Sequence, residues 1–168
     1  MSVVEQRIIE LGFEFPQVVP PLAAYVPAVR SGNLVFTAGA LPLVAGELLA
    51  HGLVADQPGD DVVDGWVVDR GLVDVELAKR CAAQCALNAI AAVGTVADLD
   101  TIMRVVKVTG FVAGVEGFTS HPQVVNGASE LLLAIWGDRG KHARSAVGVS
   151  TLPLGSPVEV ELVFEVAD

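Results

Sequence analysis

The sequence predicts an α/β protein (α+β in the wider sense) in which a mixed β-sheet carries two long helices on one face. Two stretches, 75–93 and 120–136, place apolar residues at helical spacing, and a glycine follows each. Runs rich in valine and threonine, which are typical of strands, flank both stretches. The resulting order, β-β-(β)-α-β-α-β-β, is typical of a sheet covered by helices.

The N-terminal segment is expected to dock on the body of the protein. Apolar spacing from Val4 to Leu11 predicts a short amphipathic helix that ends at Gly12. A connector containing Pro16 and the pair Pro20–Pro21 follows. We therefore expect residues 1–22 to be a helix and connector within a single domain that spans residues 1–168.

The next segment begins with a predicted hairpin. Residues 24–30 and 34–38 read as two strands, joined by the turn Ser31-Gly32-Asn33. Signals are weakest over 44–74, which we interpret as an extended insertion with a strand over 48–54 and loops at 56–61 and 64–65. His51, alone on that apolar strand, is predicted to be structural or solvent-facing rather than a ligand.

Both long helices and the strand between them show patterns of burial. Cys81 and Cys85 lie four residues apart on one helix face, a poor geometry for a disulfide, so we predict two small buried residues. The strand 102–113 is almost continuously apolar, which predicts cover on both faces. Asn126 lies off the apolar stripe of the second helix, so burial does not explain it, although an exposed asparagine near a helix start is common.

The C-terminal stretch carries the candidate chemistry. Residues 145–166 predict a closing hairpin with a Leu-Pro-Leu-Gly turn, Arg144 at the mouth of one strand and Glu159 on the other. A guanidinium can hold a carboxylate through two parallel hydrogen bonds, and a glutamate opposite it can position a water. We interpret this hairpin as the floor of a site for a small carboxylate. The alternative is an edge hairpin with an exposed arginine and a solvated glutamate.

A local cationic cluster precedes this hairpin. His142 stands among Arg139, Lys141 and Arg144 in a chain of net charge −10, which is consistent with an anion site or with a solvated turn. The three histidines are too scattered to predict a metal site, and no glycine-rich phosphate loop is present. No metal or cofactor is expected.

Composition limits the classes of partner. The chain is 52% hydrophobic and 18% charged, with mean hydropathy +0.58, so we expect apolar surface to be buried between subunits. No apolar run approaches the ~18 residues of a membrane span, and no signal peptide is visible, which predicts a cytoplasmic protein without a membrane contact. Twenty acidic residues against ten basic ones make nucleic-acid binding a poor hypothesis.

Several motifs resemble one known family. Ala-Arg-Ser-Ala-Val at 143–147, Leu152–Pro153 and Val-Glu-Val-Glu at 158–161 resemble the C-terminal signature of the RidA (YjgF, or L-PSP) family. Residues 25–42 resemble the first hairpin of that family, and 105–112 and Asn126 follow in the same order. The resemblance covers residue 25 to the end. It implies a chorismate-mutase-like fold and a homotrimer with sites in the clefts between subunits.

The resemblance also implies an activity and a set of site residues. RidA proteins hydrolyse reactive enamine and imine intermediates, such as 2-aminoacrylate in its imino form, to 2-keto acids and ammonia. By this resemblance Arg144 would hold the substrate carboxylate and Glu159 would position the attacking water. The substrate pocket would be shaped by Tyr25, Gly39, Asn126 and Ala146.

The chain departs from the family pattern near the implied site. Ala38 stands where many relatives have a serine, Ala146 where many have a cysteine, and Ala40 replaces a commonly polar neighbour. Two hypotheses follow: a deaminase acting on 2-imino acids, or a non-catalytic regulatory protein that binds small carboxylates or keto acids. Some relatives carry an endoribonuclease label, and the acidic charge balance argues against that activity here.

Overall fold

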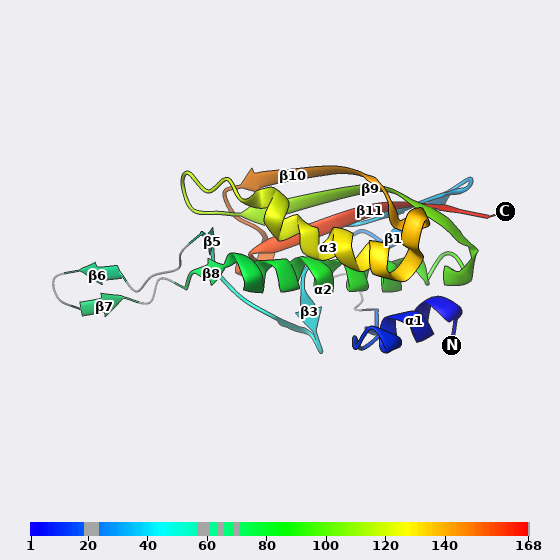
Figure 1. Cartoon of the computed structure of the whole chain (residues 1–168), viewed down its shortest axis with the longest axis horizontal. Helices are drawn as coiled ribbons and strands as arrows, with labels where there is room; N and C mark the ends of the chain where they lie inside the picture. The colour runs from blue at the N-terminus through cyan, green and yellow to red at the C-terminus, as the bar shows by residue number, and fades with distance from the viewer. Residues whose placement is uncertain (19–23, 57–60, 64–65, 69–70, 168) are drawn as a thin grey trace.

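The protein is built on one sheet with two long helices over one face, as the sequence predicts. The computed structural model describes residues 1–18, 24–56, 61–63, 66–68 and 71–167. Figure 1 shows the two long helices lying side by side across the sheet, with a short helix near the N-terminus. Among the described residues, no helix is both long enough and apolar enough to cross a membrane.

The α-helices of the described residues begin close to their predicted positions. They are α1 (Val3–Glu10), α2 (Val75–Val93) and α3 (His121–Trp136). Ser2 and Glu5 form a capping box that starts α1, and the Asp74 carboxylate caps α2 by accepting from the Leu77 N–H at 2.6 Å. Cys81 and Cys85 are free and buried in α2, which confirms their predicted burial.

A glycine sets how closely the two long helices approach. A Cβ built on Gly127 of α3 would lie 1.8 Å from the backbone oxygen of Lys79 in α2. Any side chain at this position would therefore drive α3 away from α2. The close contact keeps both helices over the same five-stranded sheet.

The sheet has the order β1-β2-β11-β9-β10. β9 and β10 run parallel and are joined through α3, whereas β11 is antiparallel to both β2 and β9. The last strand of the chain therefore lies in the middle of the sheet. The bounds are β1 (Ala28–Ser31), β2 (Leu34–Thr37), β9 (Ile102–Ala113), β10 (Ala143–Val149) and β11 (Val158–Val166).

The predicted closing hairpin is wrong. β10 and β11 do not pair, because β9 lies between them. The α3 crossover returns the chain beside β9 as a parallel edge strand, as crossover connections do. The chain then continues through the short 3-10 turn Pro153–Gly155 into β11. β11 pairs with β9 on the side away from β10. The successive strands β10 and β11 are thus separated in the sheet by β9.

The two faces of the sheet differ sharply. On β11 the residues facing the helices are fully buried, while the alternating set Glu159, Glu161, Val163 and Glu165 is only partly covered. The helix-free face also carries Val29 and Phe36, paired across β1 and β2 and 51% and 43% exposed. No described element of this chain covers that face, so its apolar side chains meet solvent in a single copy.

Residues 44–74 form short pairings instead of the predicted strand over 48–54. β3 (Leu43–Val44) pairs with β4 (Glu47–Leu48), and β5 (Val54–Ala55) pairs in parallel with β8 (Val73–Asp74). Between β4 and β5, Gly52 adopts φ +116° and packs so closely on the Gly71 carbonyl that a Cβ would lie 1.6 Å from its oxygen. This backbone conformation interrupts the strand.

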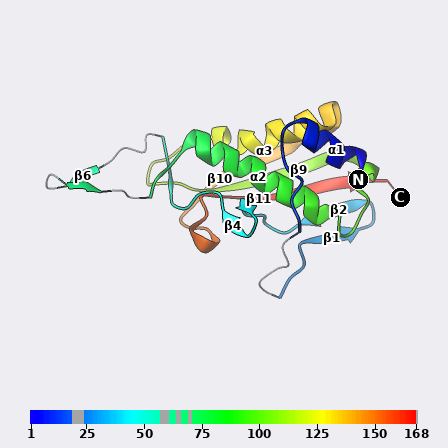
Figure 2. The ribbon, with the colours of Figure 1, turned by 90° about the horizontal axis from the view of Figure 1, so that it is seen from below.

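Other predictions in this region have mixed outcomes. His51 lies in the irregular segment between β4 and β5, exposed, with its Nδ1 3.3 Å from the Leu154 carbonyl oxygen. A hairpin of β6 (Asp61–Val63) and β7 (Trp66–Val68) projects away from the helices and the sheet (Figures 1 and 2). Residues 57–60 and 64–65 of the predicted loops, and the Pro20–Pro21 part of the connector, lie outside the described residues.

Candidate functional site

Arg144 is held against α3 by two side chains. It lies on β10, the edge strand, and pairs with the buried Val108 of β9, so its side chain is on the helix-bearing face. Its Nη1 donates to Asn126 Oδ1 at 2.8 Å and to Ser129 Oγ at 3.1 Å. Asn126 thus binds the guanidinium, which accounts for a polar residue off the apolar stripe of the helix.

A hydrogen-bond chain continues from Ser129 to the backbone. Ser129 Oγ lies 2.9 Å from His142 Nε2, and His142 Nδ1 lies 2.6 Å from the Gly140 carbonyl oxygen. Because a carbonyl oxygen only accepts, we assign the imidazole proton to Nδ1. In this tautomer Nε2 accepts a hydrogen bond from the Ser129 hydroxyl. The Ser129 oxygen in turn accepts from Nη1 of Arg144. The chain of contacts fixes both the position and the direction of the guanidinium.

The rest of the Arg144 guanidinium is available to a ligand. Within the described part of the chain, no acceptor is bonded to its Nε or Nη2. These two groups form one edge of the planar fork, the edge that binds a carboxylate through two parallel hydrogen bonds. The half-buried position of Arg144 strengthens such a contact relative to one in open water.

The cationic cluster predicted around His142 does not converge on one point. Lys141 Nζ pairs with Asp138 Oδ1 at 2.7 Å, and Arg139 Nη1 donates to the Ile102 carbonyl oxygen at 3.2 Å. Of the three basic residues, Arg144 alone is bound to α3. The anion-binding capacity of this stretch is therefore concentrated in one arginine.

Glu159 occupies a different position, against a glycine. It lies on the helix-free face of β11, and a Cβ built on Gly39 would lie 1.7 Å from its Oε1. Burial, together with the nearby Glu161 carboxylate, raises the pKa of Glu159 above its ordinary value of 4.5. A carboxyl group with a raised pKa is better matched to proton transfer near neutral pH.

The backbone around Gly39 is anchored by α2. Ala40 exchanges two backbone hydrogen bonds with Val160, at 2.8 and 3.1 Å. Asn88 Nδ2 donates to the carbonyl oxygens of Leu41 and Leu43 at 2.8 and 3.0 Å. Asn88 was not among the predicted site residues, although it is the one polar residue between Ala86 and Val93. It holds the segment that places Gly39 against Glu159.

Arg144 and Glu159 are not on adjacent strands, contrary to the prediction. β9 separates them, and they lie on opposite faces of the sheet. The register sets Glu159 opposite Phe111, three residues along β9 from the Val108 partner of Arg144. Strand geometry puts their Cα atoms about 10 Å apart across the sheet and about 10 Å apart along it. One chain cannot direct both side chains at one small molecule.

The remaining predicted residues divide between these two positions. Ala146 lies two residues along β10 from Arg144 on the same face, and Asn126 contacts Arg144 directly. Gly39 belongs with Glu159. Tyr25 belongs to neither position: it was predicted to start the first strand, but β1 begins only at Ala28, and Tyr25 precedes it, 52% exposed, at the sheet edge opposite β10. Apart from Tyr25, the predicted residues thus form one group around Arg144 and another around Glu159, which we name the arginine half-site and the glutamate half-site of a candidate site.

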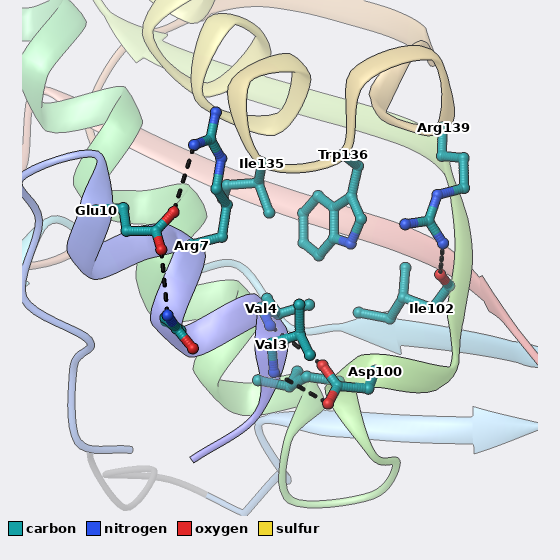
Figure 3. A pocket seen from close by; sticks show the side chains of 11 residues that line it. Val3, Val4, Arg7, Glu10, Asp100, Ile102, Ile135, Trp136 and Arg139 are labelled. Atoms are coloured by element: carbon teal, nitrogen blue, oxygen red, sulfur yellow. Dashed lines mark hydrogen bonds and ion pairs between the residues drawn. The ribbon is translucent and has the colours of Figure 1, made fainter.

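A hollow of about 480 Å³ lies elsewhere, between α1 and the C-terminal end of α3. Figure 3 shows Trp136 and Ile135 at its wall and Arg7 and Arg139 on opposite sides. The Asp100 carboxylate accepts from the N–H groups of Val3 and Val4 at 3.0 and 3.1 Å and so ties down α1. None of the predicted site residues lines this hollow.

Metal chemistry has no evident location in the described residues. No three His, Cys, Asp or Glu side chains in them come together as metal ligands would. His121, at the start of α3, lies over Gly148, whereas His142, which precedes β10, contacts Ser129.

The family follows from comparison with known proteins. Residues 5–166 match the model of the family described as "YjgF/chorismate_mutase-like, putative endoribonuclease". The chain belongs to this family, and its mixed sheet with helices on one face is the chorismate-mutase-like fold. It is also 37% identical over 158 residues to Protein TCP17 of Trypanosoma cruzi, covering 92% of this chain and 89% of that protein.

Solved structures agree with this assignment. The crystal structure of Atu1372, a protein of unknown function from Agrobacterium tumefaciens, is 39% identical, with a TM-score of 0.79 and coverage of 98% of this chain and 92% of that one. The YjgF gene product of E. coli is 22% identical, with a TM-score of 0.56 over 89% of this chain and 93% of its own. The second likeness shows the fold alone.

Proposed function

We propose that this protein is an imine deaminase that hydrolyses reactive 2-imino acids to 2-keto acids and ammonia. The observation that carries the proposal is the Arg144 guanidinium, oriented by Asn126 and Ser129 with one hydrogen-bonding edge left for a carboxylate. A 2-imino acid presents such a carboxylate beside its C=N carbon. The RidA resemblance of residues 143–161 supports the same assignment.

The proposed site lies between copies of the chain. Arg144 and Glu159 are on opposite faces of one sheet, so a substrate needs Arg144 from one copy and Glu159 from another. The exposed Val29 and Phe36 on the helix-free face give a second copy an apolar surface to cover. Three copies related by a cyclic axis would form three identical clefts, as the RidA resemblance implies.

The chemistry requires orientation, one water and proton transfer. Arg144 binds the substrate carboxylate, and Glu159 accepts a proton from the water that attacks the C=N carbon. A C–O bond forms as the π electron pair of the C=N bond moves to nitrogen, and Glu159 then passes its proton to that nitrogen. The C–N bond of the carbinolamine breaks, ammonia leaves, and the hydroxyl proton returns to Glu159 as the carbonyl of the keto acid forms. A protonated imine is already electrophilic, so positioning of water and substrate supplies most of the required catalysis.

A coupled assay tests the activity. An amino-acid oxidase generates the imine in place, and its decay is followed by absorbance with and without the protein. We expect faster decay than spontaneous hydrolysis. Arg144→Lys keeps the positive charge but loses the planar pair of N–H donors that binds a carboxylate. It should lower kcat/KM on the order of ten- to a hundredfold, which corresponds to the loss of about one charge-assisted hydrogen bond.

Matched variants show whether the effect belongs to the site. Arg144→Ala should lose more activity than Arg144→Lys, whereas Arg80→Ala, an exposed arginine on α2, should leave turnover unchanged. Glu159→Gln should lower kcat with keto-acid binding kept, and Glu165→Gln on the same strand and face is its control. Full activity of Arg144→Ala would reject the proposal.

A non-catalytic carboxylate-binding protein is the second candidate. Ala38 and Ala146 stand where many relatives have a serine and a cysteine, so two polar groups near the proposed substrate are absent. Arg144 alone could still bind a keto acid. Calorimetry with 2-oxobutanoate beside the deaminase assay separates the two functions, because binding without turnover favours the second candidate.

A further inference from the structure

The helix-facing side of β10 carries a strip of small residues that leads away from Arg144. Alternate residues of a strand share a face, so Arg144, Ala146 and Gly148 lie on one side. Their partners on β9 are Val108, Gly110 and Val112, and all three are buried beneath the helices. Because β10 is the edge strand, the strip formed by Ala146 and Gly148 is open to solvent along its outer side.

His121 stands at the far end of this strip. A Cβ built on Gly148 would lie 2.5 Å from His121 Nε2, so glycine is the residue that allows the ring to sit there. Helix α3 runs above the strip, with Asn126 and Ser129 at the Arg144 end and His121 at the Gly148 end. The arginine and the imidazole therefore bracket the strip.

The imidazole is held in place but retains its polar groups. Its ring packs edge-on against Phe118, with centroids 5.1 Å apart and planes at 85°. In the described part of the chain neither ring nitrogen of His121 has a hydrogen-bond partner, and the residue is only half-buried. The adjacent Ser120 hydroxyl donates to Asp56 instead. His121 can therefore donate a ring N–H to a ligand lying on the strip.

The span between the two polar ends indicates the length of that ligand. Four residues of β10 separate Arg144 from Gly148, about 13 Å, and five residues of α3 separate Asn126 from His121, about 7.5 Å. The Arg144 and His121 side chains bridge part of this backbone separation, so a ligand that bonds to both must be a short chain of a few carbons. A five-carbon chain with a polar group at each end meets this requirement. The imino acid derived from alanine has no second polar end to reach His121.

We propose that His121 selects imino acids whose side chain ends in a carbonyl oxygen, as a carboxylate or an amide. The inference rests on the proposed function and names its substrate class. Arg144 binds the carboxylate next to the imine, the small side chain of Ala146 leaves room for the carbon chain, and the His121 ring N–H, seated over Gly148, donates to the terminal oxygen. His121 is thus a specificity-determining residue.

Turnover of matched imines tests this proposal. Imines are generated by oxidases from glutamate, glutamine, norleucine and alanine, of which norleucine matches the length of glutamate without its terminal oxygen. We expect kcat/KM for the glutamate or glutamine imine to exceed that for norleucine on the order of tenfold, the effect of one hydrogen bond. The two polar imines distinguish a preference for charge from one for the oxygen itself.

Two variants assign the preference to the strip. His121→Phe keeps an aromatic ring beside Phe118 and should abolish the preference, so that the glutamate and norleucine imines have the same kcat/KM. Gly148→Ala places a methyl group where the His121 ring lies and so displaces the ring. This variant should therefore also lose the preference for imines with a terminal oxygen. Calorimetry with 2-oxoglutarate and 2-oxohexanoate gives a readout that does not need turnover.

The outcomes separate this inference from the proposed function. Hydrolysis of the alanine imine without any preference for a polar terminus rejects the role of His121 and keeps the deaminase. A preference that survives both variants also rejects it. If no imine is hydrolysed, the deaminase is rejected, and calorimetry then tests the role of His121 by itself. Equal affinities for 2-oxoglutarate and 2-oxohexanoate overturn that role. Tighter binding of 2-oxoglutarate that depends on His121 supports it.

Discussion

In the proposed site, each of the two half-sites has neighbours that contact its central side chain. Arg144 is fixed by Asn126 and by the hydroxyl of Ser129, which is itself oriented by His142. The Glu159 carboxylate lies directly against Gly39, where the absence of a side chain leaves room for it. Changes at these supporting residues should therefore affect substrate binding and catalysis separately.

Ser129→Ala removes the hydroxyl between Arg144 and His142. The guanidinium loses one of its two anchors, so we expect KM to rise roughly tenfold with a smaller change in kcat, as for one lost hydrogen bond to a charged group. Steady-state kinetics with the alanine imine measure both constants. Glu130→Gln, at the next position of α3, is the control. Unchanged KM would mean that Arg144 needs no support from this chain of contacts.

Gly39→Ala tests the glutamate half-site. The new methyl group would occupy the position of the Glu159 carboxylate, which must swing away. We expect kcat to fall on the order of tenfold or more, while calorimetry shows keto-acid binding by Arg144 preserved. Equal loss of binding and turnover would place Gly39 in the carboxylate-binding part of the cleft instead.

The raised pKa of Glu159 predicts a pH-dependent stability. The Glu159 carboxyl binds its proton more tightly in the folded state than in the unfolded chain. Its contribution to the free energy of unfolding is therefore full at pH values below its pKa in the unfolded chain. That contribution is lost as the pH rises through its pKa in the folded protein. Glu159→Gln removes the cost of ionising a half-buried group. Its Tm should exceed that of wild type at pH 7 and match it at low pH. An advantage that grows as pH falls would contradict this sign.

At the scale of elements, packing depends on small residues at close contacts. Gly127→Ala would force a methyl group into the Lys79 carbonyl. We expect a loss of about 1–3 kcal/mol, because overpacking displaces a helix, and a fall in Tm of about 2–4 °C for each kcal/mol. Thermal unfolding followed by circular dichroism measures it. Gln123→Ala, exposed on the same helix, should leave Tm close to wild type.

Local patterns predicted individual elements better than their arrangement. The α2 stretch is found as predicted, and α3 begins one residue later, because apolar periodicity and the following glycine are local signals. The closing hairpin was wrong because strand order is set by non-local pairing: α3 returns the chain parallel to β9, and β11 then pairs on the other side of β9. No local feature of residues 145–166 distinguishes this path from a hairpin.

The same limit applies to the candidate site. Arg144 and Glu159 could be selected from their chemistry and from the family resemblance. Their placement on opposite faces follows from the strand order and the register, which the sequence pattern does not reveal. Asn88 was missed because its function is to bond two backbone carbonyls in a segment more than forty residues away.

For the whole molecule, a mixing experiment tests whether the site is shared between copies. Arg144→Ala and Glu159→Gln should each be nearly inactive alone. In randomly mixed assemblies, about a quarter of the clefts would pair an intact Arg144 with an intact Glu159 from another copy. We expect activity to recover to about that fraction after the two variants are dissociated and reassembled together. No recovery would show that each site draws on a single chain.

The helix-free face gives a second test at this scale. Phe36 lies on it and is 43% exposed in the single chain. Phe36→Glu would place a charge where another copy packs, so we expect wild type to be a trimer and this variant to be largely monomeric and inactive. Light scattering measures the mass. Phe13→Glu, which lies outside the sheet, is the control, and an unchanged mass for Phe36→Glu would remove this face from the interface.

The position of β11 has a consequence for synthesis of the protein. This strand is the last in the chain, yet it joins β2 to β9 at the centre of the sheet. Until residues 158–166 have left the ribosome, the β1–β2 hairpin and the β9–α3–β10 unit have no strand to link them. The five-stranded sheet can therefore form only after residues 158–166 have emerged, and a nascent chain stopped before residue 158 should remain sensitive to protease.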